Sequence, residues 1–268
     1  MTSPILPTTA WAGGAENSDT HLVQGRLRFC HYGLDGLHDH GWGCGYRTVQ
    51  SILSWYEPRE NVPPPTIPEL QQILGMSGCG SSWIGVQDAV VILDVFGHVV
   101  KVLPLGSGAE AVNHYPALVS HFDSGGGPLM IGGGADVYSK TVIGVRMLPA
   151  TPLPELLILD PHYDGPPAGG PAASVEALCK EGWAAWRPLS SCLRAESFYN
   201  IALPQRPQPD RPSARAVGVA HGQAAARATL VDAIPAPASA SAFARTNADA
   251  NAEQWGFEVI GEGFSDVS

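Results

Sequence analysis

The sequence predicts an α+β fold. Most helical patterns come before residue 100, whereas strand candidates cluster in the second half of the chain, so the two kinds of element do not alternate as in repeated βαβ units. Of the 268 residues, 44% are hydrophobic and 15% are charged. This composition supplies a sizeable core and argues against wholesale disorder.

One strand and three helices are predicted in the first half of the chain. Residues 22–30 are expected to form a short strand. Apolar side chains recur at helical spacing over 44–56, and the proline-rich segment that follows ends this helix. Two more helices are predicted over 66–75 and 85–96, the latter with Gly97 as its C-cap.

A strand at 98–105 and a helix at 109–123 come next. Three strand candidates follow, and then two segments that supply further sheet edges. In chain order these five segments are PLMIGG, KTVIGVRML, ELLILD, GWAAWRPL and SFYNIALP.

The composition divides the chain into four parts. Residues 1–20 are small and polar and are expected to form a loose leader, whereas 21–204 carries the predicted helices and strands. Residues 205–250 are rich in Ala and Pro without apolar periodicity, which predicts a flexible linker. Residues 251–268 place apolar side chains among acidic ones, as docking motifs do. These apolar side chains include Trp255, Phe257, Val259 and Ile260.

Charge and cysteine usage exclude several classes of protein. The net charge is −10 and no basic run occurs, so nucleic acid is not an expected partner. No apolar run approaches the ~18 residues that a membrane span needs. The odd cysteine count and the lack of a hydrophobic signal segment predict reduced thiols in the cytoplasm, with the nucleus as a second location. The cysteines are Cys30, Cys44, Cys79, Cys179 and Cys192.

Cys44 stands where a thiol could be activated. It lies between two glycines in HDHGWGCGYRTVQSILSWY, where the first predicted helix begins. A helix N-terminus carries partial positive charge and unpaired N–H groups, and a nearby imidazolium would lower the thiol pKa further. The same cysteine could be a small buried hydrophobe, so its interpretation depends on partners.

The best partners lie in LILDPHYDG, at the end of a predicted strand. Asp160 and His162 are two positions apart and therefore point to one side, and Pro161 stiffens the segment between them. A carboxylate beside an imidazole fixes its tautomer and supports the imidazolium that a Cys–His pair requires. The alternative is a strand-ending turn with no catalytic meaning.

Two other kinds of site have weaker support. His and Cys residues crowd into fifteen positions that end at Cys44, but their spacing fits no familiar zinc arrangement. The segment GGGPLMIGGG lacks the pattern of a phosphate-binding loop, so a tight strand junction is favoured there. We therefore expect neither a metal nor a cofactor.

The motifs YGLDGLHDHGWGCGYRTVQ and LDPHYDG together resemble those of the ubiquitin-fold-modifier-specific cysteine proteases, the UfSP family. The similarity covers about residues 25–204 and includes SSWIG, PLMIGGG, TVIGV and SFYNIALP in order. The resemblance implies a papain-like fold, in which a helix that bears the nucleophile packs on a mostly antiparallel sheet. The short leader resembles the compact form of these enzymes.

By this resemblance the catalytic residues can be assigned. Cys44 is the nucleophile, His162 the general base and Asp160 the residue that orients it. Tyr32 matches the family tyrosine whose hydroxyl helps to form the oxyanion hole. A ring packed at a strand end is the alternative role for Tyr32.

The implied reaction is hydrolysis after the C-terminal glycine of the ubiquitin-fold modifier, in precursors or conjugates. A glycine-ended substrate suggests a narrow channel, and Trp42 and Gly43, with Gly41, are candidates for its walls or for packing at the helix entry. Autophagins, the proteases of the autophagy modifier, share GWGC and DPH and are the nearest rival. GYRTVQ and HYDG favour the UfSP family.

The segment EQWGFEVI resembles the modifier-binding stretch of the activating enzyme of the same pathway. Such stretches add a strand to the modifier's sheet edge, and some serve autophagy modifiers. A flexible tether would then raise the local concentration of substrate. The hypotheses to separate are a thiol isopeptidase, expected to be a monomer, and a catalytically weak adaptor that binds the modifier through this tail.

Overall fold

A computed structural model describes residues 5–11, 19–57, 64–76, 80–134, 138–149, 151, 153–165 and 173–207. The chain divides into two units, Met1–Ala233 and Ile234–Ser268, and all described residues belong to the first. The predicted linker lies outside the described residues from position 208 onward, as does the whole docking motif. Both therefore stay predictions.

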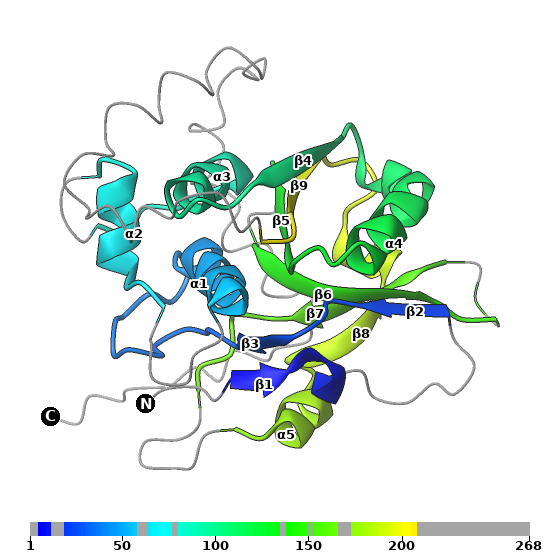
Figure 1. The fold of residues 1–268 in the computed structure, drawn as a ribbon, viewed down its shortest axis with the longest axis horizontal. Coiled ribbons are helices and arrows are strands. Elements are labelled where there is room, and N and C mark those ends of the chain that lie inside the picture. The colour runs from blue at the N-terminus through cyan, green and yellow to red at the C-terminus, as the bar shows by residue number, and fades with distance from the viewer. Residues whose placement is uncertain are drawn as a thin grey trace, which may run out of the picture. The chain divides into compact units, whose positions relative to one another are not determined.

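The described residues form a two-stranded sheet, in which β1 pairs with β3, and a seven-stranded sheet (Figure 1). The larger sheet has the order β4-β9-β5-β6-β7-β8, and β2 pairs with the second half of β6. Its strands pair antiparallel. The strands are β1 (Ile5–Pro7), β2 (Asp19–Leu22), β3 (Arg26–Arg28), β4 (Val100–Leu105), β5 (Leu129–Gly133), β6 (Lys140–Met147), β7 (Glu155–Leu159), β8 (Ala184–Pro188) and β9 (Tyr199–Pro204).

Helices cover both faces of the larger sheet. In Figure 1, α1, α2 and α3 lie on one side of it and α4 lies on the other. The predicted α+β class, with helices on a mostly antiparallel sheet, is confirmed. The helices are η1 (Thr8–Trp11), α1 (Cys44–Tyr56), α2 (Ile67–Ile73), α3 (Val86–Val95), η2 (Gly108–His114), α4 (Tyr115–Asp123), α5 (Val175–Lys180) and α6 (Leu189–Cys192).

Three elements differ from the sequence prediction. Residues 5–11, expected in a loose leader, form β1 and η1, because β1 pairs with β3 and the buried Thr8 N–H donates to the Gly25 carbonyl. The strand predicted at 22–30 is divided into β2 and β3 by Gly25, whose φ of 106° breaks extended backbone. The helix predicted at 109–123 is α-helical only from Tyr115, with Pro116 in its first turn.

The core lies in layers on the two faces of the sheet. Alternate residues of β5 show this: Leu129 and Ile131 belong to the cluster that includes α4, whereas Met130 belongs to the cluster of α1, α2 and α3. A third cluster places β7 and β8 against α5 and the residues around β3. The helix α1 is thus buried along nearly its whole length.

The sheet topology gathers several strand ends at one edge. Thr141, near the start of β6, pairs with Leu159 at the end of β7, so the residues before β6 and after β7 are neighbours. The helix α1 packs on β5 and β6. This edge is where the predicted catalytic residues meet.

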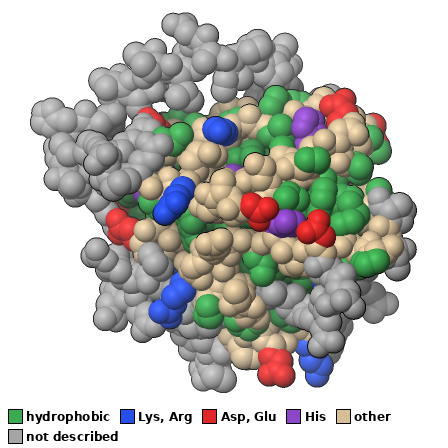
Figure 2. All heavy atoms as spheres, turned by 45° about the vertical axis from the view of Figure 1, so that its right-hand side comes forward, with side chains coloured by type: hydrophobic (Ala, Val, Ile, Leu, Met, Phe, Trp, Pro, Cys, Tyr) green, Lys and Arg blue, Asp and Glu red, His purple; other side chains and the backbone are tan. Residues whose placement is uncertain are grey.

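The rest of the described surface is mixed in character. On the face shown in Figure 2, acidic and basic side chains are scattered and hydrophobic ones lie between them. No helix among the described residues is both long enough and apolar enough to cross a membrane. No disulfide links Cys30, Cys44, Cys179 or Cys192 among the described residues, and Cys79 lies outside them.

Candidate active site

Cys44 is the first residue of α1, and Gly43 is the N-cap of that helix. The thiol is buried with 3% of the residue exposed. The helix supplies its unpaired N–H groups and the positive end of its dipole at this position. The sequence places the thiol here because the apolar face of 44–56 packs on the sheet and brings its first turn to the strand ends.

The glycines beside Cys44 are explained by close packing. A Cβ added at Gly43 would overlap the Asp39 carboxyl group. A Cβ at Gly45 would lie 2.7 Å from Cγ1 of Ile84 and 2.9 Å from its carbonyl oxygen. Both positions therefore require a residue without a side chain for the N-terminus of α1 to approach its neighbours.

Trp42 also has a packing role in this structure. It is 9% exposed, its ring meets the Tyr46 ring edge-on at 5.9 Å, and its Nε1 donates to the His38 carbonyl at 3.2 Å. These contacts place Trp42 in the core beneath the helix entry. A role for Trp42 and Gly43 in walling a substrate channel stays a prediction.

Asp160 and His162 form a tight pair directly after β7. His162 donates from its backbone N–H to Oδ1 of Asp160 at 3.1 Å, and its ring Nδ1 lies 2.5 Å from the same oxygen. The backbone N–H of Asp160 donates to the Trp183 carbonyl at 2.8 Å, which fixes the start of the turn. The carboxylate thus holds one ring nitrogen and leaves Nε2 for another partner.

Cys44 is the group that fits this place. Nε2 of His162 is buried and has no hydrogen-bond partner among the described residues, while the imidazole and the Cys44 thiol each shift the pKa of the other. Contacts of this kind are commonly long before substrate binds and tighten afterwards. The structure therefore brings Cys44, His162 and Asp160 together as the predicted triad requires.

The electrostatics favour a charged Cys–His pair. Burial by itself would raise the pKa of the Cys44 thiol, but the hydrogen bond and charge of His162 lower it below its ordinary value. Burial would lower the pKa of His162, but hydrogen bonds and charge from Asp160 and Cys44 raise it to about 9. The pKa of Asp160 is lowered despite burial, because His162 pairs with it. A thiolate beside an imidazolium is the nucleophilic form.

Tyr32 lies against this pair. Its backbone N–H donates to the Pro161 carbonyl at 3.0 Å, and its ring meets the His162 ring edge-on at 5.2 Å. Burial and the neighbouring Cys44 both raise the pKa of the Tyr32 hydroxyl. The hydroxyl therefore stays protonated and can donate to the sulfur or to an oxygen that becomes negative beside it.

A buried ion pair holds the loop that contains Tyr32 and ends at Cys44. The sequence interpretation missed this pair. Asp39 and Arg47 are each 0% exposed, and Nε of Arg47 lies 2.7 Å from Oδ2 of Asp39. The other carboxyl oxygen of Asp39 accepts a hydrogen bond from the Gly33 N–H at 2.8 Å. The backbone carbonyl of Asp39 accepts one from the Gly43 N–H at 2.7 Å. Asp39 thereby joins the loop of Tyr32 to the start of α1. The sequence signal that could have indicated the pair was an arginine within a helix predicted to be buried.

Cys30, His31 and His40, which also lie near Cys44 in the sequence, have partners of their own. His31 Nδ1 lies 2.8 Å from the Tyr32 carbonyl, and the Cys30 N–H donates to the Ser51 hydroxyl at 3.0 Å. His40 pairs with Asp164. Among the described residues, no three His, Cys, Asp or Glu side chains form a group that could hold a metal ion.

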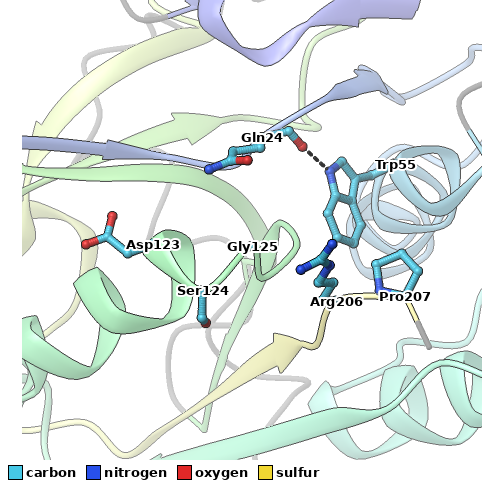
Figure 3. A pocket seen from close by; sticks show the side chains of 7 residues that line it. All are labelled: Gln24, Trp55, Asp123, Ser124, Gly125, Arg206 and Pro207. Carbon is cyan, nitrogen blue, oxygen red and sulfur yellow. Dashed lines mark hydrogen bonds between the residues drawn. The ribbon is translucent and has the colours of Figure 1, made fainter.

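A hollow of about 300 Å³ lies away from these residues, beside the C-terminal part of α1 (Figure 3). Trp55 forms one wall, and its Nε1 donates to the Gln24 carbonyl at 2.6 Å. Arg206 and Pro207, which follow β9, line it as well. It contains none of the residues of the candidate active site, so the chemistry of Cys44 does not depend on it.

Comparisons with known proteins agree with this geometry. Residues 18–202 match the profile described as Peptidase family C78. Ufm1-specific protease 1 of Mus musculus is 39% identical over 192 residues, which cover 68% of this chain and 84% of that protein. Ufm1-specific protease 2 of Gallus gallus is 37% identical over 205 residues, which cover 73% of this chain but only 43% of that longer protein.

A solved structure shares the fold. The crystal structure of UfSP from C. elegans superposes with a TM-score of 0.64 and 30% sequence identity. The match covers 76% of this chain and 38% of that chain. The likeness therefore covers most of the described part of this chain and less than half of the other protein.

Proposed function

Because the chain belongs to peptidase family C78, we propose that it is a cysteine protease that hydrolyses the bond after the C-terminal glycine of Ufm1, the ubiquitin-fold modifier. The observation that carries this proposal is the pairing of His162 with Asp160 beside the buried Cys44 thiol at the N-terminus of α1. Relatives named Ufm1-specific proteases support the choice of modifier over the autophagy modifier.

The geometry supports the following sequence of steps. The Cys44 thiolate attacks the glycyl carbonyl carbon, and the resulting oxyanion accepts a hydrogen bond from the Tyr32 hydroxyl. The His162 imidazolium then donates its proton to the leaving amine, which departs as the acyl-enzyme forms. Neutral His162 next takes a proton from water, whose oxygen attacks the thioester; the Cys44 thiolate leaves, and the carboxylic acid that forms loses its proton to solvent. Asp160 keeps the ring in the required tautomer throughout.

A panel of precursors tests the choice of substrate. Purified full-length chain is incubated with Ufm1 that carries a C-terminal extension, and in parallel with extended ubiquitin and an extended autophagy modifier. We expect cleavage of the Ufm1 precursor at least tenfold faster than the other two. The control is the same preparation alkylated with iodoacetamide, which should be inactive. Faster cleavage of the autophagy modifier would instead support the autophagin-like alternative.

The pH dependence of cleavage should report the Cys–His pair. The imidazolium loses its proton as the pH rises through the His162 pKa of about 9, and the thiolate is lost as the pH falls through the lowered pKa of Cys44. We expect a bell-shaped profile of kcat/KM with an alkaline limb near pH 9, in which the two apparent values belong to the coupled pair. Asp160→Asn should move the alkaline limb to lower pH, and an unmoved limb would contradict the assignment.

Replacing Tyr32 by Phe should lower kcat without a comparable change in KM. The substitution removes only the hydroxyl, and the loss of one oxyanion donor costs about 10²–10³ in rate. Steady-state kinetics on the extended precursor measure the effect. A rise in KM with kcat unchanged would show that Tyr32 binds the ground state and not the oxyanion.

We further propose that the segment 251–268 binds the modifier by adding a strand to its sheet. Support comes from its composition, with Trp255, Phe257, Val259 and Ile260 among acidic residues. Deletion of this segment should raise KM more than it lowers kcat, since a tether acts through local concentration. Trp255→Ala should weaken binding of Ufm1 to the full chain, and unchanged binding would remove the proposal.

A further inference from the structure

The side chain of His40 connects the two loops that carry the candidate catalytic residues. The first loop follows β3, contains Tyr32 and ends at Cys44; the second follows β7 and contains Asp160 and His162. Nε2 of His40 lies 2.9 Å from Oδ1 of Asp164 in the second loop. The His40 ring also lies 5.0 Å from the Tyr32 ring, between centroids.

This placement means that two histidine rings contact the Tyr32 ring. The His162 ring lies 5.2 Å from it, at an interplanar angle of 82°, and the His40 ring lies 5.0 Å from it at 46°. The Tyr32 backbone is held separately, by its hydrogen bond to the Pro161 carbonyl. The position of the hydroxyl beyond the ring therefore depends on these ring contacts.

We propose that His40 is a positioning residue: it packs on Tyr32 so that the phenol hydroxyl stays directed at Cys44, and Asp164 anchors it there. The inference rests on the proposed protease function and adds two residues of its motifs to which no role was assigned. His40 stands in HDHGWGCG, just before the glycines, and Asp164 is the last acidic residue of DPHYDG. The contacts of the pair lead to the Tyr32 ring, so each residue acts through Tyr32.

The expected effect of replacing His40 or Asp164 is small, because both side chains are exposed. The side chains of His40 and Asp164 are 53% and 75% exposed, and ion pairs in water stabilise weakly. Catalysis is more sensitive than stability to such a contact, because a small misplacement of an oxyanion donor costs rate directly. We expect His40→Ala and Asp164→Asn to lower kcat about three- to fivefold, with KM and the melting temperature unchanged.

A double-mutant cycle separates positioning from other roles. If His40 acts through the Tyr32 hydroxyl, His40→Ala should have no further effect on kcat in the Tyr32→Phe background. The proposal would be overturned if the two substitutions lowered kcat independently, so that their factors multiplied in the double variant. It would also be overturned if His40→Ala changed only KM. His38→Ala is the matched control, because His38 is an exposed histidine of the same loop for which the described residues show no ring contact with Tyr32. It should behave as wild type.

A second measurement needs no modifier. Iodoacetamide labelling of Cys44 at pH 7, followed by peptide mass spectrometry, reports how well the thiolate is stabilised, and the Tyr32 hydroxyl is one of the groups that stabilise it. Positioning predicts about two- to threefold slower labelling in Asp164→Asn, because Tyr32 is less well held. Direct electrostatics predicts the opposite, since removal of a negative charge favours a nearby thiolate. Faster or unchanged labelling would therefore overturn the proposal, even if the precursor assay failed for wild type.

Discussion

Replacement of Cys44 by Ala is expected to abolish cleavage of the Ufm1 precursor, with kcat lowered by at least about 10⁴. In the proposed mechanism the sulfur forms the acyl-enzyme, and Cys44 is the thiol that shifts the pKa of His162. Cys44→Ser should be nearly as damaging. A hydroxyl in this site has a much higher pKa than a thiol, so His162 and the helix N-terminus cannot keep it ionised.

The measurement is single-turnover cleavage of the extended precursor by the full chain. Cys179→Ala is the matched control, because Cys179 is an exposed free thiol on α5 and should be replaceable without effect. Equal cleavage by wild type and Cys44→Ala would contradict the assignment of the nucleophile. Ufm1 should still bind Cys44→Ala with wild-type affinity, because the change removes only one buried atom. Loss of binding together with activity would indicate a folding defect instead.

Removal of either partner of the Asp39–Arg47 pair should cause the largest loss of stability. Both side chains are 0% exposed, and Asp39 also holds the Gly33 and Gly43 N–H groups. Among the described residues, Asp39→Ala would leave the guanidinium with Asp35 as its remaining charged partner, and the Gly33 N–H would lose its carboxylate acceptor. Breaking a buried pair from one side typically costs about 3–5 kcal/mol.

Guanidinium chloride unfolding of the full chain measures this cost. The double variant Asp39→Leu with Arg47→Met should recover part of the stability, because neither fully buried position then carries a charge, and Asp35, which loses its partner, is partly exposed to water. Its activity should stay low, since the Gly33 N–H loses the carboxylate acceptor that holds the backbone beside Tyr32. Asp164→Asn is the exposed control and should change the free energy of unfolding by less than about 1 kcal/mol. A similarly small change in Asp39→Ala would contradict the role given to the pair.

The helix α1 was predictable from the sequence, because its apolar side chains recur at helical spacing and such a face has to be buried. The start of α4 was not predictable from the sequence. The 3₁₀ helix η2 precedes it directly, and its residues have a composition similar to that of α4. The pairing of β1 with β3 could not be foreseen either. Short strands gain stability only from their partner, and neither segment has a pattern of its own.

The candidate site was predictable to a different degree for each residue. Asp160 and His162 are close in sequence, so local geometry alone brings them together. Cys44 and Tyr32 were assigned by resemblance. Asp39 and Arg47 were missed, because a buried charged pair depends on both partners being enclosed by elements distant in the chain.

By itself the sequence determined which groups are chemically able to act: a thiol at a helix start, and an imidazole two residues from a carboxylate after a strand. Only the tertiary structure decided that these groups meet. The antiparallel pairing of β6 with β7 and the packing of α1 on β5 and β6 bring His162 to Cys44. The pKa shifts of both residues follow from that meeting, since burial and a paired charge exist only in the folded chain. The same holds for Tyr32, whose hydroxyl becomes a useful donor because the fold buries it beside the sulfur.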